Sequence, residues 1–232
     1  MAIFVTGDTH REHDFAKLEF FAKRNPQLTK NDYVIIAGDF GGVWWRKTLS
    51  EDLKPYEDLP FTVLFIDGNH ENFDLLYSYP VREWNGGKVH FIKPDIIHLM
   101  RGQVFELEGN TIFTFGGATS IDRIYRTENV NLWAEEIPSQ ADYENALQNL
   151  ENHNFTVDYV ITHSCDEKGL YYLPREAVSD RKTYLENVMM RNFFEKLSFK
   201  KWYFGHFHTD KNLPDGRVAL YNKIIPLGAE II

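Results

Sequence analysis

Short apolar runs alternate with stretches of helical periodicity in the first third of the chain, and this alternation constrains the fold more than any other feature. The apolar runs have strand length and lie at residues 3–6, 33–37 and 62–66. Phe15, Leu18 and Ala22 recur at helical spacing between the first two runs, and a second helical stretch precedes the third. The pattern predicts a βαβαβ unit.

Local signals mark the ends of these first helices. Asn25-Pro26 predicts the end of the first helix, because proline cannot continue a helix through its missing N–H. Thr48-x-x-Glu51 predicts a capping box that opens the second helix.

The character of the chain changes after residue 88, where apolar runs follow one another without helical spacing. These runs lie at residues 89–92, 96–100, 104–107 and 111–115. Turn signals at Lys93-Pro94-Asp95 and Gly109-Asn110 separate them, so we predict an antiparallel meander. Further helices are predicted over residues 143–150 and 185–197, and further strands at residues 157–161, 202–204, 218–221 and 224–225. No repeat or linker divides the pattern, and we expect one domain over residues 1–232.

Composition limits the function classes. The 232 residues are 43% hydrophobic, which is enough for a sizeable core, and the net charge of -9 predicts no general affinity for nucleic acid. No apolar run reaches membrane-spanning length, and the N-terminal residues do not resemble a secretion signal. Cys165 is the single cysteine, so no intrachain disulfide can form. We expect a cytoplasmic protein without membrane contact.

Polar cassettes follow the ends of five apolar runs. They are Asp8-Thr9-His10, Gly38-Asp39, Gly68-Asn69-His70-Glu71, Thr162-His163 and Gly205-His206-Phe207-His208. Side chains at the carboxyl ends of strands can converge on one crevice. Carboxylate, imidazole and amide oxygen are ligands for divalent cations, and two such cations suit phosphoester hydrolysis. The candidate ligands are Asp8, His10, Asp39, Asn69, His163, His206 and His208. They suffice for two ions if one carboxylate bridges, and Asp39 is the expected bridge.

Each cassette alone has an ordinary interpretation. A single Asp-x-His is more often a turn aspartate and a surface histidine, Asp67-Gly68 favours a hairpin turn, and His163 fits a core position. The combination favours metal, because five of the nine histidines fall in the cassettes. The other four are interpreted as ordinary: His13, His90, His98 and His153.

The order of these cassettes resembles the signature of the calcineurin-like metallophosphoesterases, from Asp8 to His208. The resemblance implies a four-layer αββα sandwich of two mixed sheets with a dinuclear site at one edge. It implies two ligand sets on either side of the bridge Asp39. One set is Asp8, His10 and His208, and the other is Asn69, His163 and His206.

The resemblance also implies an activity. Such a protein hydrolyses phosphomonoesters or phosphodiesters by attack of a metal-bridging hydroxide, and His70 protonates the leaving oxygen as general acid. The alternative for His70 is a supporting histidine without proton transfer. Two Mn²⁺ ions are the expected cofactor, although Fe, Zn or Ni would satisfy the same ligands.

The sequence departs from the protein Ser/Thr phosphatase branch, in which an Asp-Arg-Gly run follows the bridging aspartate. Here Phe40-Gly41-Gly42 follows Asp39, which weakens a protein-phosphatase interpretation and leaves His70 without its usual partner. Glu71 is a candidate for that role. Arg123 and Arg126 are candidate substrate-binding residues, since guanidinium groups bind phosphate, and the alternative is a solvated surface loop.

Two further questions remain open from the sequence. Trp44 and Trp45 could form an aromatic wall for a base or phenyl leaving group, or belong to the core. The alternatives for function are a nuclease or nucleotide pyrophosphatase of the same family, and a non-catalytic binding scaffold on this fold. A scaffold should have lost metal ligands or His70, and all eight residues are present.

Overall fold

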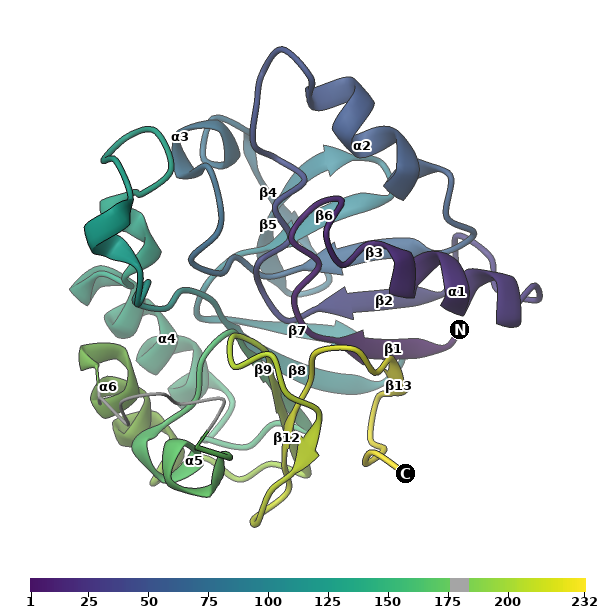
Figure 1. Cartoon of the computed structure of the whole chain (residues 1–232). Helices are drawn as coiled ribbons and strands as arrows, with labels where there is room; N and C mark the ends of the chain where they lie inside the picture. The colour runs from purple at the N-terminus through teal and green to yellow at the C-terminus, as the bar shows by residue number, and fades with distance from the viewer. Residues whose placement is uncertain (176–183) are drawn as a thin grey trace.

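The computed structural model describes residues 1–175 and 184–232, and it places two mixed β-sheets face to face with helices outside them (Figure 1). The first sheet contains β1 (Ile3–Thr6), β2 (Tyr33–Ile36), β3 (Thr62–Phe65), β4 (Val81–Trp84), β5 (Gly87–Lys93), β6 (Ile96–Leu99) and β13 (Ile225–Pro226). The second contains β7 (Gln103–Leu107), β8 (Asn110–Phe115), β9 (Tyr159–Thr162), β10 (Lys201–Phe204), β11 (Lys211–Asn212) and β12 (Arg217–Ala219). In the described residues the strand orders are β13-β1-β2-β3-β6-β5-β4 and β11-β12-β10-β9-β8-β7.

Helices cover the outer face of each sheet. The first sheet carries α1 (Ala16–Arg24), α2 (Leu49–Glu57) and α3 (Phe73–Leu76), and the second carries α4 (Gln140–Asn152), α5 (Glu167–Tyr172) and α6 (Leu185–Phe194). Two 3₁₀ turns, η1 (Arg123–Tyr125) and η2 (Ala134–Glu136), lie between β8 and α4. The expected αββα sandwich is confirmed.

Hydrophobic residues form three buried layers between these four layers of structure. In β2, Val34 and Ile36 pack against the helices, whereas Ile35 points to the second sheet. Successive side chains of a strand face opposite sides, so a strand covered on both faces must be apolar throughout. This explains why residues 33–37 and 62–66 read as continuous apolar runs.

The βαβαβ prediction is confirmed. Strands β1, β2 and β3 are parallel neighbours, with Phe4 opposite Val34 and Val34 opposite Val63. Helix α1 ends at Arg24, just before Asn25-Pro26. The capping box is wrong in detail: Thr48 precedes α2, but its Oγ1 donates to Asp52 Oδ2 at 2.6 Å and makes no cap hydrogen bond.

The predicted meander is wrong at its centre. Strands β5 and β6 are antiparallel, as are β7 and β8, but β6 pairs in parallel with β3 and β7 belongs to the other sheet. The chain crosses between sheets at Arg101-Gly102, where Gly102 adopts φ +68°. Arg101 is buried there against Asp67, which lies just beyond β3, and this ion pair holds the crossing beside the first sheet.

The structure contains a strand that the apolar pattern did not indicate. Strand β4 is exposed along residues 81–83 and pairs with β5 through the turn Asn85-Gly86, with φ values of 46° and 89°. An Asn-Gly turn with two positive φ angles is a strong hairpin signal, and it could have identified this strand. None of the helices in the described ranges is both long and apolar enough to cross a bilayer.

Candidate metal centre

The five cassettes follow the carboxyl ends of parallel strands. Strands β1, β2 and β3 are parallel in the first sheet, and β9 and β10 are parallel in the second. Contacts between cassettes cross from one sheet to the other: His206 N donates to Asp8 Oδ1 at 3.0 Å, and His163 Nε2 lies 3.3 Å from Asp39 Oδ1. The two sheets therefore meet at one polar edge.

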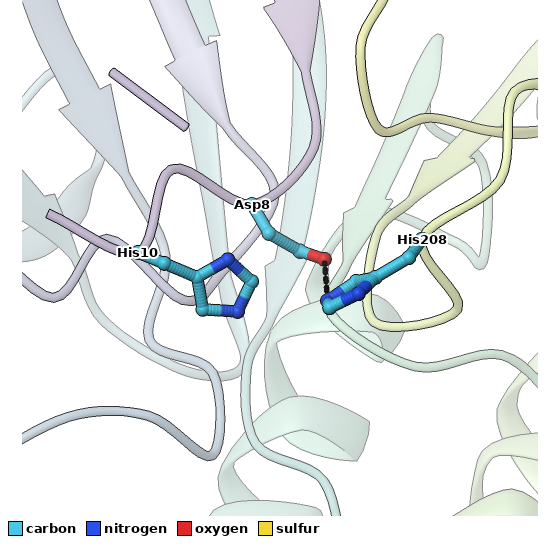
Figure 2. Close-up of side chains that lie close together, drawn as sticks. All are labelled: Asp8, His10 and His208. Carbon is cyan, nitrogen blue, oxygen red and sulfur yellow. Dashed lines mark ion pairs between the residues drawn. The ribbon is translucent and has the colours of Figure 1, made fainter. Parts of the chain in front are cut away.

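One cluster consists of Asp8, His10 and His208, whose candidate ligand atoms all lie within 4.8 Å of one another. Figure 2 shows Asp8 between the two imidazoles, with a dashed line from its carboxylate to His208. Asp8 Oδ2 lies 3.3 Å from His208 Nε2. His10 Nδ1 donates to Asp14 Oδ2 at 2.7 Å, which leaves Nε2 facing the centre. The ring of His208 stacks on that of Tyr221, with the ring centroids 4.5 Å apart. A histidine whose second nitrogen is held by a carboxylate is typical of metal ligands.

A second group surrounds His163. Its Nδ1 donates to the carbonyl oxygen of Ala37 at 2.8 Å, so Nε2 faces the centre. Nε2 lies 3.1 Å from Asn69 Oδ1 as well as 3.3 Å from Asp39 Oδ1. The ring of His206 lies 5.0 Å from that of His163.

Asp39 is central to the arrangement. Its Oδ2 lies 3.3 Å from His10 Nε2, while its Oδ1 lies 3.3 Å from His163 Nε2. Asp39 therefore presents one carboxylate oxygen to each of the two groups. Asp8 and Asp39 also form a close trio with His163, and all three are buried.

The backbone is strained at four candidate ligands. His10, Asp39, His206 and His208 have φ values of 41°, 51°, 65° and 45°. Non-glycine residues rarely adopt this left-handed region, and such strain concentrates at functional sites. The turns after these strands therefore keep an unfavourable backbone conformation that directs the four side chains toward the site.

Two glycines permit the close approach of the cassettes. A Cβ at Gly68 would lie 2.1 Å from Asp39 Oδ1, and one at Gly205 would lie 2.3 Å from Asp8 Oδ1. Any side chain at either position would displace a buried carboxylate. The glycines that precede Asn69 and His206 are therefore part of the site.

The buried carboxylates control the charge of the imidazoles. Burial lowers the pKa of His163, but Asp39 and Asp8 outweigh it and raise that pKa to about 9. The pKa of His10 is likewise raised to about 9, against burial, by Asp39 and Asp8. His163 and His10 in turn help to hold the pKa of Asp39 well below its usual value despite burial. Burial, followed by the charge of His163, lowers the pKa of His206 to about 3. At neutral pH the protonated rings of His10 and His163 therefore place positive charge beside these carboxylates.

His70 adjoins the two groups: its ring nitrogen, His10 and Asp39 present candidate ligand atoms that all lie within 4.8 Å of one another. Its backbone N–H donates to Asp39 Oδ1 at 2.7 Å, and its ring lies 5.2 Å from that of His10. Burial lowers the pKa of the ring, and Arg126 contributes in the same direction. Arg126 Nη2 lies 2.7 Å from His70 Nε2, and Arg126 also forms an ion pair with Asp122, whose Oδ1 lies 2.8 Å from Arg126 Nε.

The candidate role of Glu71 as partner of His70 is wrong. Glu71 is buried, and its carboxylate accepts hydrogen bonds from the backbone N–H groups of Phe40 at 2.8 Å and Gly41 at 3.2 Å. It braces the turn after Asp39 instead. Burial, with the nearby charge of Asp39, raises its pKa to about 8.

The two candidate substrate-binding arginines differ in their surroundings. Arg126 contacts His70, whereas Arg123 forms an ion pair with the buried carboxylate of Glu136. Glu136 also accepts from Ser120 Oγ at 2.7 Å, and Ser120 Oγ accepts from Asn69 Nδ2 at 3.1 Å. The sequence interpretation missed Ser120 and Glu136. The only signal for them was Gly116-Gly117 after β8, since glycines allow close approach of the backbone to other groups.

His90 and His98, which the sequence pattern led us to interpret as ordinary, belong to a buried polar cluster. Both are buried, His98 Nε2 lies 3.2 Å from Asp67 Oδ1, and the Nδ1 atoms of the two rings lie 3.0 Å apart. Asp67 also pairs with Arg101. Asp67-Gly68 does not form a hairpin turn, because β3 is followed by helix α3 and not by a strand.

An open depression of about 500 Å³ lies over the centre. Its lining includes His10, His70 and His208 together with Trp44 and Trp45. Trp45 is 47% exposed and is not a core residue. The site can therefore admit a small molecule from solvent.

Comparison with known proteins shows the family of the chain. The family model of calcineurin-like phosphoesterases matches residues 1–210, and the chain belongs to that family of metal-dependent hydrolases. Among solved structures, the phosphopantetheinyl hydrolase from Mycobacterium tuberculosis is similar, at 14% identity and a TM-score of 0.44. That match covers 95% of this chain and 88% of the hydrolase. No curated protein sequence matches this chain significantly.

Proposed function

We propose that the protein is a dinuclear metal-dependent phosphoesterase that hydrolyses phosphomonoesters or phosphodiesters. The observation that carries this proposal is the position of Asp39, whose two carboxylate oxygens lie 3.3 Å from His10 Nε2 and from His163 Nε2. A carboxylate between two histidine-containing groups suits two cations that share one ligand.

The donor set fits such ions. Asp8, His10 and His208 would hold one ion, Asn69, His163 and His206 the other, and Asp39 both. Mixed imidazole and oxygen ligands suit Mn²⁺, which we propose as the cofactor, and also Fe, Zn and Ni. When bound, the ions would supply Lewis-acid stabilisation of phosphate charge and acidify a coordinated water. The strained backbone and the close-approach glycines support the same assignment.

His70 and Arg126 would handle the substrate. Arg126 Nη2 donates toward His70 Nε2, so that nitrogen carries no proton while the contact lasts. A phosphate anion competes for the guanidinium, because charged bidentate contacts are stronger than a contact to a neutral ring. Arg126 would thus move to the phosphate, and His70 Nε2 would take up a proton from solvent and donate it to the leaving oxygen. Arg123 would act indirectly, because its ion pair holds Glu136, which binds Ser120 and through it Asn69.

A panel of substrates tests the proposal. Purified protein with added Mn²⁺ should hydrolyse at least one of an aryl phosphomonoester, an aryl phosphodiester and a nucleoside pyrophosphate. Hydrolysis of the pyrophosphate alone would favour the nucleotide pyrophosphatase alternative, and cleavage of a long nucleic acid would favour the nuclease. Failure on every substrate would favour the scaffold and overturn the proposal.

A further inference from the structure

We infer that the metal centre has an adjoining aromatic subsite, formed by Trp44 and Trp45, for a phosphoester whose leaving group carries a planar aromatic ring. The inference rests on the proposed function and specifies its substrate class. Both tryptophans line the depression that contains His10, His70 and His208. A phosphate bound beside His70 and a ring against Trp45 would occupy one continuous space.

Trp45 has the exposure expected of a binding surface. It is 47% exposed, although burial of a large aromatic ring is strongly favourable. Its ring meets that of Trp44 edge to face, with centroids 6.4 Å apart and an interplanar angle of 78°. An incoming ring could therefore stack on one tryptophan and meet the edge of the other.

Trp44 is also held in place by a second aromatic contact. Its ring lies 5.5 Å from that of Trp133 at an interplanar angle of 90°. Trp133 is buried, and its Nε1 donates to Asp74 Oδ2 at 3.0 Å. This packing orients the aromatic wall before any ligand arrives, which lowers the entropy cost of binding.

The wall is also tied to the chain segment of the metal centre. Asn72 Nδ2 donates to the carbonyl oxygen of Trp44 at 2.8 Å, and Asn72 lies two residues after His70. A second depression of about 350 Å³ shares Trp44 and Trp45 with the first, and its lining also includes Asn72 and Trp133. The aromatic surface is thus larger than the part that lines the depression with His70, which leaves room for a ring beside the proposed phosphate position.

Matched pairs of substrates isolate the ring from the reactivity of the ester. A nucleoside 5′-monophosphate is compared with ribose 5-phosphate, and benzyl phosphate with ethyl phosphate, all with Mn²⁺. Within each pair the leaving oxygen belongs to a primary alcohol, so the ring is the main difference. We expect kcat/KM to be about tenfold higher for the ring-bearing member of at least one pair, because stacking of a ring on an aromatic side chain stabilises a complex by about this factor.

Variants assign the preference to the wall. Trp45→Ala should reduce the ratio of kcat/KM values toward one, while Trp45→Phe, which retains a ring, should preserve most of it. Phe20→Ala is the matched control, because Phe20 is 67% exposed on α1, outside the depression, and its loss should leave the ratio unchanged.

The outcomes separate the two proposals. A preference in the nucleotide pair alone identifies a nucleobase, and a preference in both pairs identifies ring stacking in general. Equal kcat/KM values within both pairs, or a ratio that Trp45→Ala does not change, would overturn the aromatic subsite while hydrolysis itself upheld the phosphoesterase. Absence of hydrolysis of these four esters and of the wider phosphoester panel would overturn both.

Discussion

Asn69 Nδ2 donates a hydrogen bond to Ser120 Oγ at 3.1 Å, and this contact determines which end of the amide faces the metal centre. Ser120 Oγ gives its own proton to Glu136 Oε2 at 2.7 Å, because a buried carboxylate only accepts. Ser120 must therefore accept from Asn69. The amide oxygen is left facing His163 Nε2 at 3.1 Å, where the proposed ion would need a ligand.

Ser120→Ala should weaken metal binding. The variant removes the acceptor that orients the amide of Asn69, so Nδ2 and Oδ1 can exchange places. Loss of a partner of this kind lowers metal affinity by about 10–100-fold. Competition titration with a chelating dye measures the effect, and Ser78→Ala, which removes a hydroxyl bonded to Leu75 O, is the control. Equal affinities in Ser120→Ala and the unmodified protein would refute the role of Ser120.

His70→Ala should lower turnover without loss of metal. The ring lies beside the centre and contacts Arg126, while the backbone N–H that binds Asp39 remains in the variant. General-acid catalysis contributes about 10²–10⁴-fold to a rate. Steady-state kinetics and metal analysis of the same sample check both parts. The variant His153→Ala, far along the chain at the end of α4, serves as control. Unchanged kcat in His70→Ala would exclude the general-acid role.

Metal binding should release protons at neutral pH. The pKa values of His10 and His163 are raised to about 9, so both rings are protonated at pH 7 in the metal-free protein. A ligand histidine must be neutral, so binding expels these protons. Apparent metal affinity should rise with pH and level off above about 9. Calorimetry in two buffers of different ionisation enthalpy measures the proton count. A heat of binding independent of the buffer at pH 7 would contradict this prediction.

Acid should destabilise the fold through His90. Burial, followed by the charge of His98, lowers the pKa of His90 from 6.5 to about 4. Between these values the unfolded chain binds a proton that the folded chain does not, so unfolding becomes more favourable as pH falls from 6.5 to 4. The slope from this group is at most about 1.4 kcal/mol per pH unit. Urea denaturation across this range should show a shallower dependence in His90→Asn, and an unchanged slope would refute the assignment.

Features that depend on neighbouring residues could be predicted from the sequence. Strand β2 and helix α1 follow from local periodicity, and Asp39 follows from its place after an apolar run. The αββα arrangement could be predicted only because the five cassettes together resemble the calcineurin-like family. No single cassette indicates which strands lie side by side. Asp39 was expected to bridge two ions, and this stays a prediction; the structure places its two carboxylate oxygens 3.3 Å from His10 Nε2 and 3.3 Å from His163 Nε2.

Features that depend on distant partners could not be predicted. Residues 96–107 look like a hairpin locally, but pairing of β6 with β3 and burial of Arg101 against Asp67 divide them between sheets. Glu136 lies 16 residues from Ser120, and nothing near either residue indicates their contact. His98 appeared ordinary because Asp67, its partner, is 31 residues away.

The metal content of the protein tests the central claim most directly. The protein is stripped with a chelator, loaded with Mn²⁺, freed of excess ion and analysed for metal per chain, while phosphoester hydrolysis is followed at each stage. We predict two ions per chain, with activity lost on stripping and restored on loading. Retention of fewer than two ions at full activity, or hydrolysis that survives complete removal of metal, would contradict a dinuclear centre built around Asp39.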